Sequence, residues 1–418
     1  MSCMRVIGTV LAVLLGNSST YAQTSTLWIA TGNDVAGVAQ RSFTGRASLA
    51  DGRPVFRTFE SNNGISVAEI AESALDEFVG LIHSGYPRCG GFTVHASREA
   101  ALNEVNNAAN IAGFRAPGRL PDTIDQQSVV KPALDQVSGA TIVRMITALQ
   151  DIGTRYYQTQ KGQEAAELIR REWEMLGSKR TDFSVALFPH GWIQNSVIGT
   201  IRGVSAPDEI VVIGAHLDSI NQQNRENAPG ADDDASGVAV VTETLRVLTE
   251  IGFKPRRTIQ FIAYAAEEVG LRGSGEIADK YKAEGRNVIA ALQMDMTGFK
   301  GSERDVYLIN DFVSPELNSF LTTLLQEYNS SDAHKITHAE TSCGYACSDH
   351  HSWTRNGVHA AFPFEAAFAD YNRAIHTPQD TVSTLDATGA HQARFAKLGI
   401  EFLIETAKSA GDVSAQAR

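Results

Sequence analysis

Three adjacent aspartates, Asp232, Asp233 and Asp234, are the residues whose type and spacing most clearly indicate chemistry. They lie in the segment 229–237 (PGADDDASG), directly before an apolar run at 238–248 that predicts a helix. One acidic side chain at a helix N-terminus is stabilised by the helix dipole, by at most about 2 kcal/mol. Three carboxylates exceed that need, so they predict a nearby cation, unless the other two are simply solvated.

Further acidic and histidine side chains follow the apolar runs that predict strands, each at the point where a run ends. In an open α/β sheet, ligands bind beyond the carboxyl ends of the strands. The side chains at these ends are His216 and Asp218, Glu267 and Glu268, Asp295, Glu365, and His376 in the loop that follows. One histidine or one glutamate pair in such a place is usually structural or solvated. Their recurrence at successive strand ends predicts a shared site.

The donor types favour zinc, because imidazole nitrogen and carboxylate oxygen suit this ion, whereas calcium sites consist of oxygen ligands. The ligands suffice for two metal ions about 3.5–4 Å apart that share one carboxylate and one water. Glu267 and Glu268 are adjacent, so one can bind metal while the other takes the proton of the water as a general base. Asp218, two residues after His216, can accept the second N–H of that imidazole.

From about residue 126 the sequence alternates between helical periodicity and short apolar runs. It predicts helices at 137–151, 162–176, 238–251, 274–284, 315–328 and 387–407, and strands at 196–201, 210–215, 258–265, 288–294, 306–309 and 358–362. Several strands are continuously apolar, as in a sheet covered on both faces. We therefore predict an α/β fold, a three-layer sandwich with a mostly parallel central sheet flanked by helices.

Residues 23–119 have a different pattern from the rest of the chain. They show strand-like runs at 25–30, 55–59 and 91–95, a helical pattern at 66–83 and a helix-like Ala/Asn-rich stretch at 101–112. The basic segment 115–119, which contains Pro and Gly, predicts an exposed and cleavable link. We predict a small α+β pro-segment domain at 23–119 and a catalytic domain at 120–418. A permanent accessory domain is the alternative for the first of these.

Residues 1–22 have the features of a secretory signal peptide: a positive start at Arg5, an apolar run at 6–15 and a small-residue exit that ends at Ala22. The run is too short to span a bilayer, although an uncleaved N-terminal anchor is the alternative. We expect secretion, either into the periplasm or into the medium. The formal net charge of −12, without a basic stripe, argues against a nucleic-acid partner.

The four cysteines agree with an exported protein. Cys3 lies in the predicted signal peptide, and Cys89 lies in the predicted pro-segment. Cys343 and Cys347 are close enough in sequence to form a local disulfide in an oxidising compartment. A zinc-binding cysteine pair is the competing interpretation, but no second pair follows.

Taken together, these segments resemble the M28 family of secreted dizinc aminopeptidases, most closely the bacterial leucyl aminopeptidases of the Vibrio (Aeromonas) type. The matching stretches are GAHLDS at 214–219, PGADDDASG at 229–237, AEEVGLRGS at 266–274, MDMTG at 294–298, CGYACSDH at 343–350 and IHTPQDT at 375–381. The leading segment also resembles the pro-region of that group, including RCGGF at 88–92.

The resemblance implies two zinc ions per chain and a role for each candidate residue. The implied metal ligands are Asp233 as the bridge, His216 and Asp295 at one zinc, and Glu268 and His376 at the other. Glu267 would be the general base that delivers a zinc-bridging hydroxide, Asp218 the partner of His216, and Tyr345 the stabiliser of the oxyanion. Cys343 and Cys347 would form the local disulfide. The implied pocket for the first substrate side chain consists of Met296, Phe362, Phe364, Phe368 and Ile375, which are otherwise ordinary core residues.

We therefore predict a monomeric, secreted metallo-aminopeptidase that removes a large apolar N-terminal residue, such as Leu, from peptides and proteins. Its own pro-segment is expected to act as an inhibitor or a chaperone, and no membrane partner is expected. The first alternative is another zinc exopeptidase or a glutaminyl cyclase of the same fold, of which the cyclase would bind a single zinc. The second is a non-enzymatic binding module, which would lack some ligands or the base.

Overall fold

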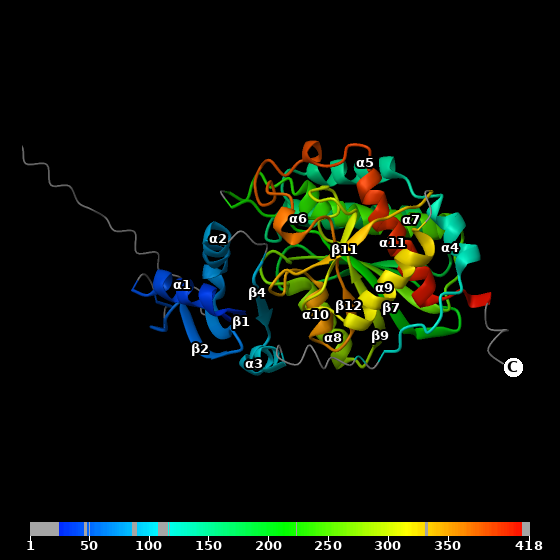
Figure 1. Ribbon diagram of the computed structural model, residues 1–418. Helices are drawn as coiled ribbons and strands as arrows, with labels where there is room; N and C mark the ends of the chain where they lie inside the picture. The colour runs from blue at the N-terminus through cyan, green and yellow to red at the C-terminus, as the bar shows by residue number, and fades with distance from the viewer. Residues whose placement is uncertain are drawn as a thin grey trace, which may run out of the picture.

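The computed structural model describes residues 25–45, 48–49, 51–85, 90–107, 116, 118–222, 224–330 and 333–411. The predicted signal peptide, Cys89 and parts of the predicted cleavable link, including Arg115, lie outside these residues. A smaller N-terminal domain lies beside a larger α/β domain (Figure 1). The predicted boundary near residue 119 and the role of the smaller domain as a pro-segment stay predictions.

A six-stranded sheet forms the centre of the larger domain, with the strand order β12-β9-β7-β8-β6-β5. The strands are β5 (Phe183–Phe188), β6 (Ser196–Ile201), β7 (Ala206–His216), β8 (Arg257–Tyr264), β9 (Asn287–Gln293) and β12 (His359–Ala361). The four strands from β12 to β8 run parallel, and β6 and β5 are antiparallel to their neighbours. The predicted α/β fold with a mostly parallel central sheet is confirmed.

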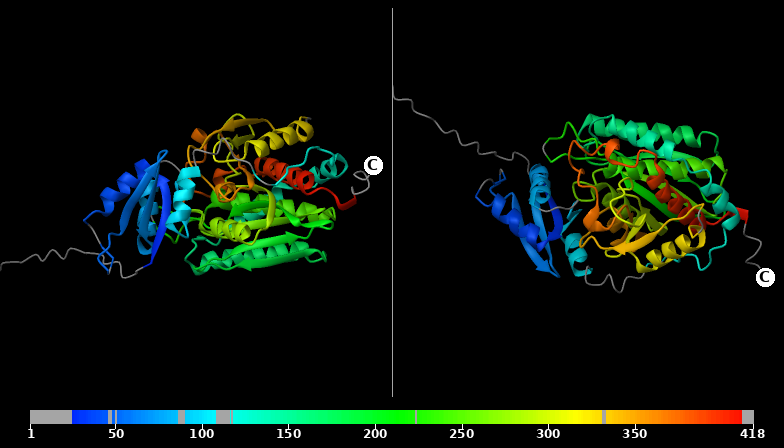
Figure 2. Two further views of the ribbon diagram at one scale, coloured as in Figure 1. Left: turned by 90° about the horizontal axis from the view of Figure 1, so that it is seen from below. Right: turned by 45° about the horizontal axis from the view of Figure 1, so that its top comes forward.

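Helices cover both faces of this sheet (Figure 2). The helices are α4 (Gln127–Leu134), α5 (Gly139–Gln150), α6 (Gln160–Gly177), α7 (Gly237–Glu250), α8 (Arg272–Ala283), α9 (Pro315–Tyr328), α10 (His350–Thr354) and α11 (Ala390–Ala407). Val211 and Ile213 of β7 belong to the main core with α5, α6, α7 and α11. Val212 between them belongs to the core under α8 and α10. Alternate residues of one strand are thus buried on opposite faces, which explains the continuously apolar sequence.

A second, three-stranded sheet lies beside the central one. It has the order β11-β10-β13 and consists of β10 (Val306–Ile309), β11 (His338–Thr341) and β13 (Pro363–Phe364). The sequence predicted β10 but neither β11 nor β13 as a separate strand. Both are short, at four and two residues, so they give little periodicity to detect.

Within its described residues, the N-terminal domain is a four-stranded antiparallel sheet with three α-helices. Its elements are β1 (Thr26–Gly32), α1 (Asn33–Phe43), β2 (Phe56–Asn62), β3 (Ile65–Ala71), α2 (Leu75–Gly85), β4 (Phe92–His95) and α3 (Arg98–Asn107). The helix predicted at 66–83 is wrong in its first part, because 65–71 form β3. Asn63 and Gly64 both have positive φ and join β2 to β3, and Asn-Gly is the commonest two-residue hairpin signal.

The N-terminal domain packs on the larger domain through a shared apolar core. Phe78 and Ile82 of α2 belong to one buried cluster with Tyr156, Ala266 and Val269 of the larger domain. The backbone N–H of Val94 in β4 donates to the carbonyl of Gly270, at 3.0 Å. In Figure 1, α2 and β4 lie on the side that faces the larger domain.

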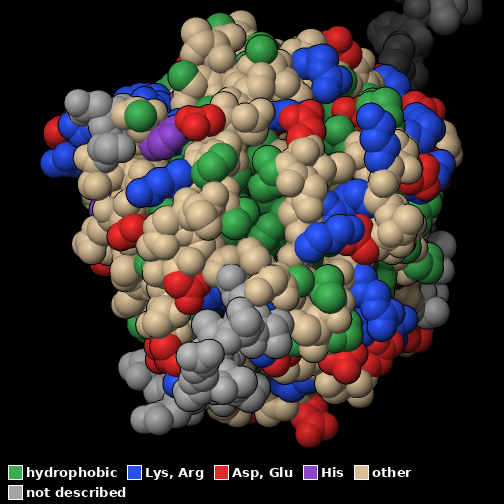
Figure 3. Space-filling view, turned by 90° about the vertical axis from the view of Figure 1, so that its right-hand side faces the viewer, with side chains coloured by type: hydrophobic (Ala, Val, Ile, Leu, Met, Phe, Trp, Pro, Cys, Tyr) green, Lys and Arg blue, Asp and Glu red, His purple; other side chains and the backbone are tan. Residues whose placement is uncertain are grey.

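The face of the larger domain that is turned away from the N-terminal domain shows acidic and basic side chains interspersed (Figure 3). Within the described residues, no helix combines the length and the apolar character that a membrane span requires.

Candidate metal centre

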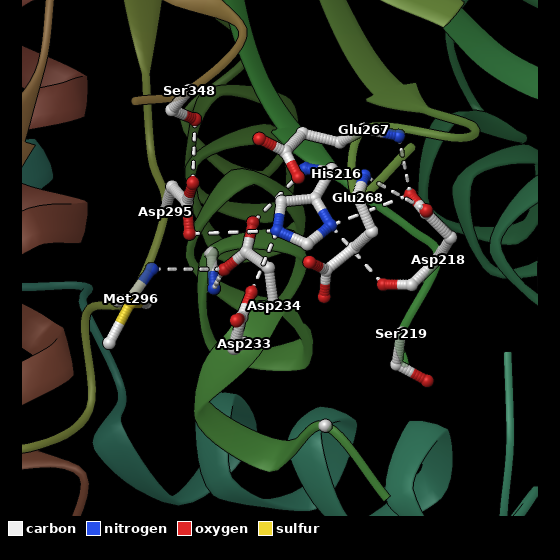
Figure 4. A network of polar contacts seen from close by, with 12 residues as sticks. His216, Asp218, Ser219, Asp233, Asp234, Glu267, Glu268, Asp295, Met296 and Ser348 are labelled. Atoms are coloured by element: carbon white, nitrogen blue, oxygen red, sulfur yellow. Dashed lines mark hydrogen bonds and ion pairs between the residues drawn. The ribbon is translucent and has the colours of Figure 1, made fainter. Parts of the chain in front are cut away.

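The loops after β7, β8 and β9 bring the candidate ligands together beside the aspartate triplet (Figure 4). His216 is the last residue of β7 and pairs with Tyr264, the last residue of β8, while Gly214 pairs with Gln293, the last residue of β9. Because these three strands are parallel and in register, their following loops emerge at one edge of the sheet. All five candidate ligands are buried there: His216, Asp233, Glu268, Asp295 and His376.

The ligands form two groups that meet at Asp233. In the first group, His216, Asp233 and Asp295 each offer a donor atom, all within 4.8 Å of one another. Nε2 of His216 lies 2.9 Å from Oδ1 of Asp233 and 3.6 Å from Oδ1 of Asp295. In the second group, Nε2 of His376 lies 2.8 Å from Oδ2 of Asp233 and 3.0 Å from Oε2 of Glu268. Asp233 therefore offers one carboxylate oxygen to each group, the arrangement expected of a bridging ligand.

One member of the second group comes from the N-terminal domain. His83 of α2 offers a donor atom within 4.8 Å of those of Glu268 and His376. The sequence did not identify His83, which stands in an ordinary amphipathic helix with no motif around it. Only the packing of the two domains brings it to the site.

The donor set fits zinc. Oε1 of Glu268 and Oδ1 of Asp295 are both buried, and neither accepts a hydrogen bond from any described residue. Buried polar atoms normally have partners, so these oxygens are accounted for by a cation. Histidine nitrogen with carboxylate oxygen is a zinc-type set, and its ligand atoms at tetrahedral zinc lie roughly 3.3 Å apart. The two groups thus have the composition and spacing to hold one metal ion each.

The electrostatics of the site also favour a cation. Burial, and then the charge of Asp233, raises the pKa of Glu268 to about 7. Burial likewise raises the pKa of Glu267 well above its usual range. Burial would raise the pKa of Asp233 as well, but hydrogen bonds from His216 and His376 hold it below its usual range. The site collects more negative charge than its two histidines balance, and metal ions would supply the missing positive charge.

The outer two aspartates of the triplet bind backbone amides, which explains why three occur together. The carboxylate of Asp234 accepts from the backbone N–H of His216 (3.0 Å), Gly237 (2.8 Å) and Met296 (3.2 Å). It thereby joins the end of β7, the start of α7 and the loop after β9. Asp232 accepts from the backbone N–H of Gly298 at 3.0 Å.

Asp380, in the loop after His376, holds the triplet from the other side. Its carboxylate accepts from the backbone N–H of Asp232 at 2.9 Å and of Asp233 at 3.1 Å. Asp380 belongs to the IHTPQDT stretch, so the sequence marked it without giving its role. Glu365, one of the acidic residues predicted to follow a strand, accepts from the backbone N–H of Phe299 (2.7 Å) and Asn372 (3.1 Å). It belongs to neither ligand group.

Asp218 positions the two glutamates. Its Oδ1 accepts from the backbone N–H of Glu267 at 2.9 Å, and its Oδ2 from that of Glu268 at 3.3 Å. Nδ1 of His216 lies 3.2 Å from the backbone oxygen of Asp218 and 3.5 Å from its Oδ1. The second imidazole nitrogen therefore faces the carbonyl of Asp218 more closely than its carboxylate. Glu267 itself is buried beside the ligands, with its carboxylate pointing toward them in Figure 4.

Two further residues hold ligands in place and were not found from the sequence. Ser348 donates its hydroxyl to Oδ2 of Asp295 at 2.6 Å. Arg155 is fully buried and donates to the carbonyls of Leu217, Pro229 and Gly230. It has no motif of its own, because its partners are backbone atoms.

An apolar cavity lies next to Asp295. Its lining also includes Met296, Phe362, Phe364, Phe368, Tyr371 and Cys347. Ile375 belongs to the same apolar cluster but not to the lining, and Tyr371 was not predicted. The place of these residues beside a metal ligand is compatible with a side-chain pocket, and that role stays a prediction.

Cys343 and Cys347 form a disulfide, as predicted. Tyr345, between them, packs against Phe368 with ring centroids 6.1 Å apart. It also lines a cavity between the two domains, opposite Thr31 and Asp34 of the N-terminal domain. Its role in stabilising an oxyanion stays a prediction.

Comparison with known proteins identifies the family. A probable leucine aminopeptidase from Trichophyton verrucosum is 34% identical over 340 residues, which cover 78% of this chain and 92% of that protein. Leucine aminopeptidase 1 from Sclerotinia sclerotiorum is 37% identical over 305 residues, 69% of this chain and 76% of that protein. The model of Peptidase family M28 matches residues 196–399. The chain belongs to peptidase family M28. It is a metallo-aminopeptidase, as the sequence predicted.

Solved structures extend the likeness. The crystal structure of LapB from Legionella pneumophila has a TM-score of 0.77 at 26% identity and covers 92% of this chain and 100% of that one. Residues 120–418 alone could not supply 92% of the chain, so the likeness includes the N-terminal domain. Two more distant structures each have a TM-score of 0.53 at 17% identity and cover 65% of this chain. They are a zinc aminopeptidase from Bacillus subtilis, of which 96% is covered, and a glutaminyl cyclase from Porphyromonas gingivalis, of which 99% is covered. These two share the fold.

Proposed function

We propose that this peptidase is a secreted leucine aminopeptidase that works with two zinc ions per chain. The observation that carries the proposal is the position of Asp233, with one oxygen in each of the two ligand groups, beside the unligated Glu267. The relatives named as leucine aminopeptidases and the zinc aminopeptidase of the same fold support it.

Zinc at this site would polarise the first carbonyl of a peptide and lower the pKa of a water molecule. Glu267 takes the proton of that water and passes it to the leaving amine, the task of a general base followed by a general acid. Burial raises the pKa of Glu267, which suits a group that must both take up and release a proton. Asp218 holds the backbone of Glu267 and thereby fixes the position of its carboxylate.

The apolar cavity beside Asp295 would accept the first side chain of the substrate, and Tyr345 would stabilise the oxyanion. Aromatic rings and Met296 form most of the lining, so Leu, Met and Phe are favoured over charged residues. Substrates would be peptides and proteins with a free N-terminus, and the enzyme would act as a monomer. Export is proposed on the signal-like residues 1–22. The N-terminal domain is proposed to be a pro-segment, removed near the link 115–119.

Hydrolysis of leucine-p-nitroanilide by the cleaved protein tests the activity. It should disappear on chelation, return with zinc, and be absent with the N-acetylated substrate. Glu267→Gln should lower kcat by about 10²–10⁴-fold while two zinc ions stay bound. Glu303→Gln is the matched control, because Glu303 is largely exposed and pairs only loosely with Arg304 at 3.8 Å. A near-normal kcat in Glu267→Gln would show that another group transfers the proton.

The zinc content separates this proposal from the cyclase alternative, which shares the fold but requires a single zinc. Two zinc ions per chain, measured by elemental analysis of the active protein, support the aminopeptidase. One zinc per chain, together with cyclisation of an N-terminal glutamine, would support the cyclase instead. Comparison of the protein in culture medium and in cell fractions tests export, and the mass of the active form tests removal of the N-terminal domain.

A further inference from the structure

The last turn of α2 in the N-terminal domain reaches the second ligand group. His83 in this turn is 8% exposed and offers a donor atom within 4.8 Å of those of Glu268 and His376. Its ring lies 4.4 Å from that of His376, measured between centroids. Oδ2 of Asp233 lies 2.8 Å from Nε2 of His376. Three donor side chains from two domains therefore lie close together, and Asp233 contacts one of them.

Nε2 of His83 is buried, and no hydrogen-bond partner among the described residues reaches it. A buried polar atom without a partner costs about 1–3 kcal/mol. A metal ion held by Glu268 and His376 would give this nitrogen a partner and remove the cost.

The contacts of α2 with the larger domain fix the position of His83. Asp76 of α2 contacts the hydroxyl of Tyr156 and the guanidinium of Arg225. His83 follows Asp76 by seven residues, or two helical turns, so the two residues lie on one face of α2. Glu72, just before α2, pairs with Arg272 at 3.0 Å.

The apolar contacts of α2 involve the very loop that carries the metal ligand. Phe78 and Ile82 share a buried cluster with Ala266 and Val269, which flank the pair Glu267 and Glu268. The same packing thus positions α2 and the glutamate loop relative to each other. The approach of His83 to Glu268 is a property of this docked arrangement.

We propose that His83 is the fourth protein ligand of the second metal ion in the uncleaved chain, beside Asp233, Glu268 and His376. The inference rests on the proposed zinc function. Zinc with four protein ligands is typical of closed, structural sites, whereas a catalytic zinc keeps one position open for water or substrate. The N-terminal domain therefore blocks catalysis by occupying the position that the substrate needs, and its removal opens that position.

His83 would bind only the second of the two metal ions. Among the described residues, the donors of the first group are His216, Asp233 and Asp295, all from the larger domain. The first metal thus keeps the same ligands before and after cleavage, while the second loses one. Metal binding itself can therefore report on His83, independently of catalysis.

The test measures zinc release from the uncleaved protein to a chromogenic chelator, for the wild type and for His83→Phe. Phenylalanine keeps a planar ring in place but has no donor nitrogen. Zinc affinity at one of the two sites should fall by at least about 100-fold, since loss of a group that only hydrogen-bonds a ligand already costs about 10–100-fold. With cobalt in place of zinc, the visible spectrum of the uncleaved wild type should show a four-coordinate site that the variant lacks.

Glu72→Gln is the matched control. It removes a contact between the same two domains, the ion pair with Arg272, but leaves His83 in place. It should retain both zinc ions as tightly as the wild type. The cleaved wild type should match His83→Phe, because both lack the imidazole. Where the phenylalanine variant does not fold, His83→Gln takes its place.

Equal zinc retention and an equal cobalt spectrum in the wild type and His83→Phe would overturn the proposal. So would an equal loss of affinity in Glu72→Gln, which would make domain contact alone responsible. Failure of the proposed function has a different signature: cleaved wild-type protein that binds no zinc and releases no leucine. These outcomes can therefore be told apart.

Discussion

Replacement of Arg155 by methionine should destabilise the protein and weaken metal binding together. Arg155 is fully buried, and its guanidinium donates to the carbonyls of Leu217 (2.8 Å), Pro229 (2.6 Å) and Gly230 (2.9 Å). Leu217 follows the ligand His216, and Gly230 lies just before the aspartate triplet. One side chain thus joins the two loops that carry His216 and Asp233, two of the three ligands of the first metal group.

The size of the effect follows from these three bonds. Methionine has a similar length but donates no hydrogen bond, so three buried carbonyls lose their donor. Each such loss costs about 1–3 kcal/mol, and some water will enter, so we expect a total of about 3–6 kcal/mol. For a domain of this size, that corresponds to a fall in Tm of roughly 5–10 °C.

The assay is thermal unfolding of the metal-free protein, followed by zinc titration. Arg155→Met should show the fall in Tm and a weaker first zinc site, while Arg155→Lys, which keeps a charge and some hydrogen bonding, should lie between it and the wild type. Arg171→Met is the control, because Arg171 is exposed on α6. A fall in Tm below about 2 °C in Arg155→Met, with normal zinc binding, would refute the idea that this residue holds the loops.

Two further predictions concern individual carboxylates. Ser348→Ala removes the 2.6 Å hydrogen bond to Asp295 and should weaken the first zinc site by about 10–100-fold, measured by chelator competition; unchanged affinity would contradict this. Partial burial alone would raise the pKa of Asp305. Hydrogen bonds from Lys300 and Thr337 outweigh this effect and lower the pKa from 3.8 to about 2. A lowered carboxyl pKa stabilises the fold above the unfolded pKa, so the Tm difference between metal-free wild type and Asp305→Asn should be constant above about pH 5, shrink as the pH falls, and be lost near pH 1, below both pKa values.

The sheet and the ligand positions could be predicted because both follow from local sequence. An apolar run that ends in a polar side chain marks the carboxyl end of a buried strand, and parallel strands bring such ends to one edge. His216 at the end of β7 and Asp295 after β9 were selected in this way. The same rule selected Glu365, whose carboxylate binds two backbone amides instead. The rule locates the edge of the sheet but does not tell which side chains there bind metal.

Arg155 and Ser348 could not be predicted because their partners are distant in the chain. Arg155 donates to carbonyls 62 to 75 residues away, and Ser348 donates to a carboxylate 53 residues away, and no spacing rule connects such pairs. The mistaken helix at 66–83 has a local cause. Only three residues separate the apolar residues of β3 from those of α2, so the two elements gave one continuous helical pattern. The hairpin signal at Asn63 and Gly64 lies just before this pattern.

The contact between the two domains explains a feature of the glutamate loop. Gly270 has φ +101°, and a Cβ atom there would lie 2.6 Å from Phe92 and 2.8 Å from Val94 of the N-terminal domain. Any other residue would therefore be strained and would also push β4 away. Gly270 stands in the stretch AEEVGLRGS beside both glutamates, where the sequence indicated only a catalytic loop. The loop has a second task, because the space at Gly270 admits β4 and thereby the domain that carries His83 to the metal site.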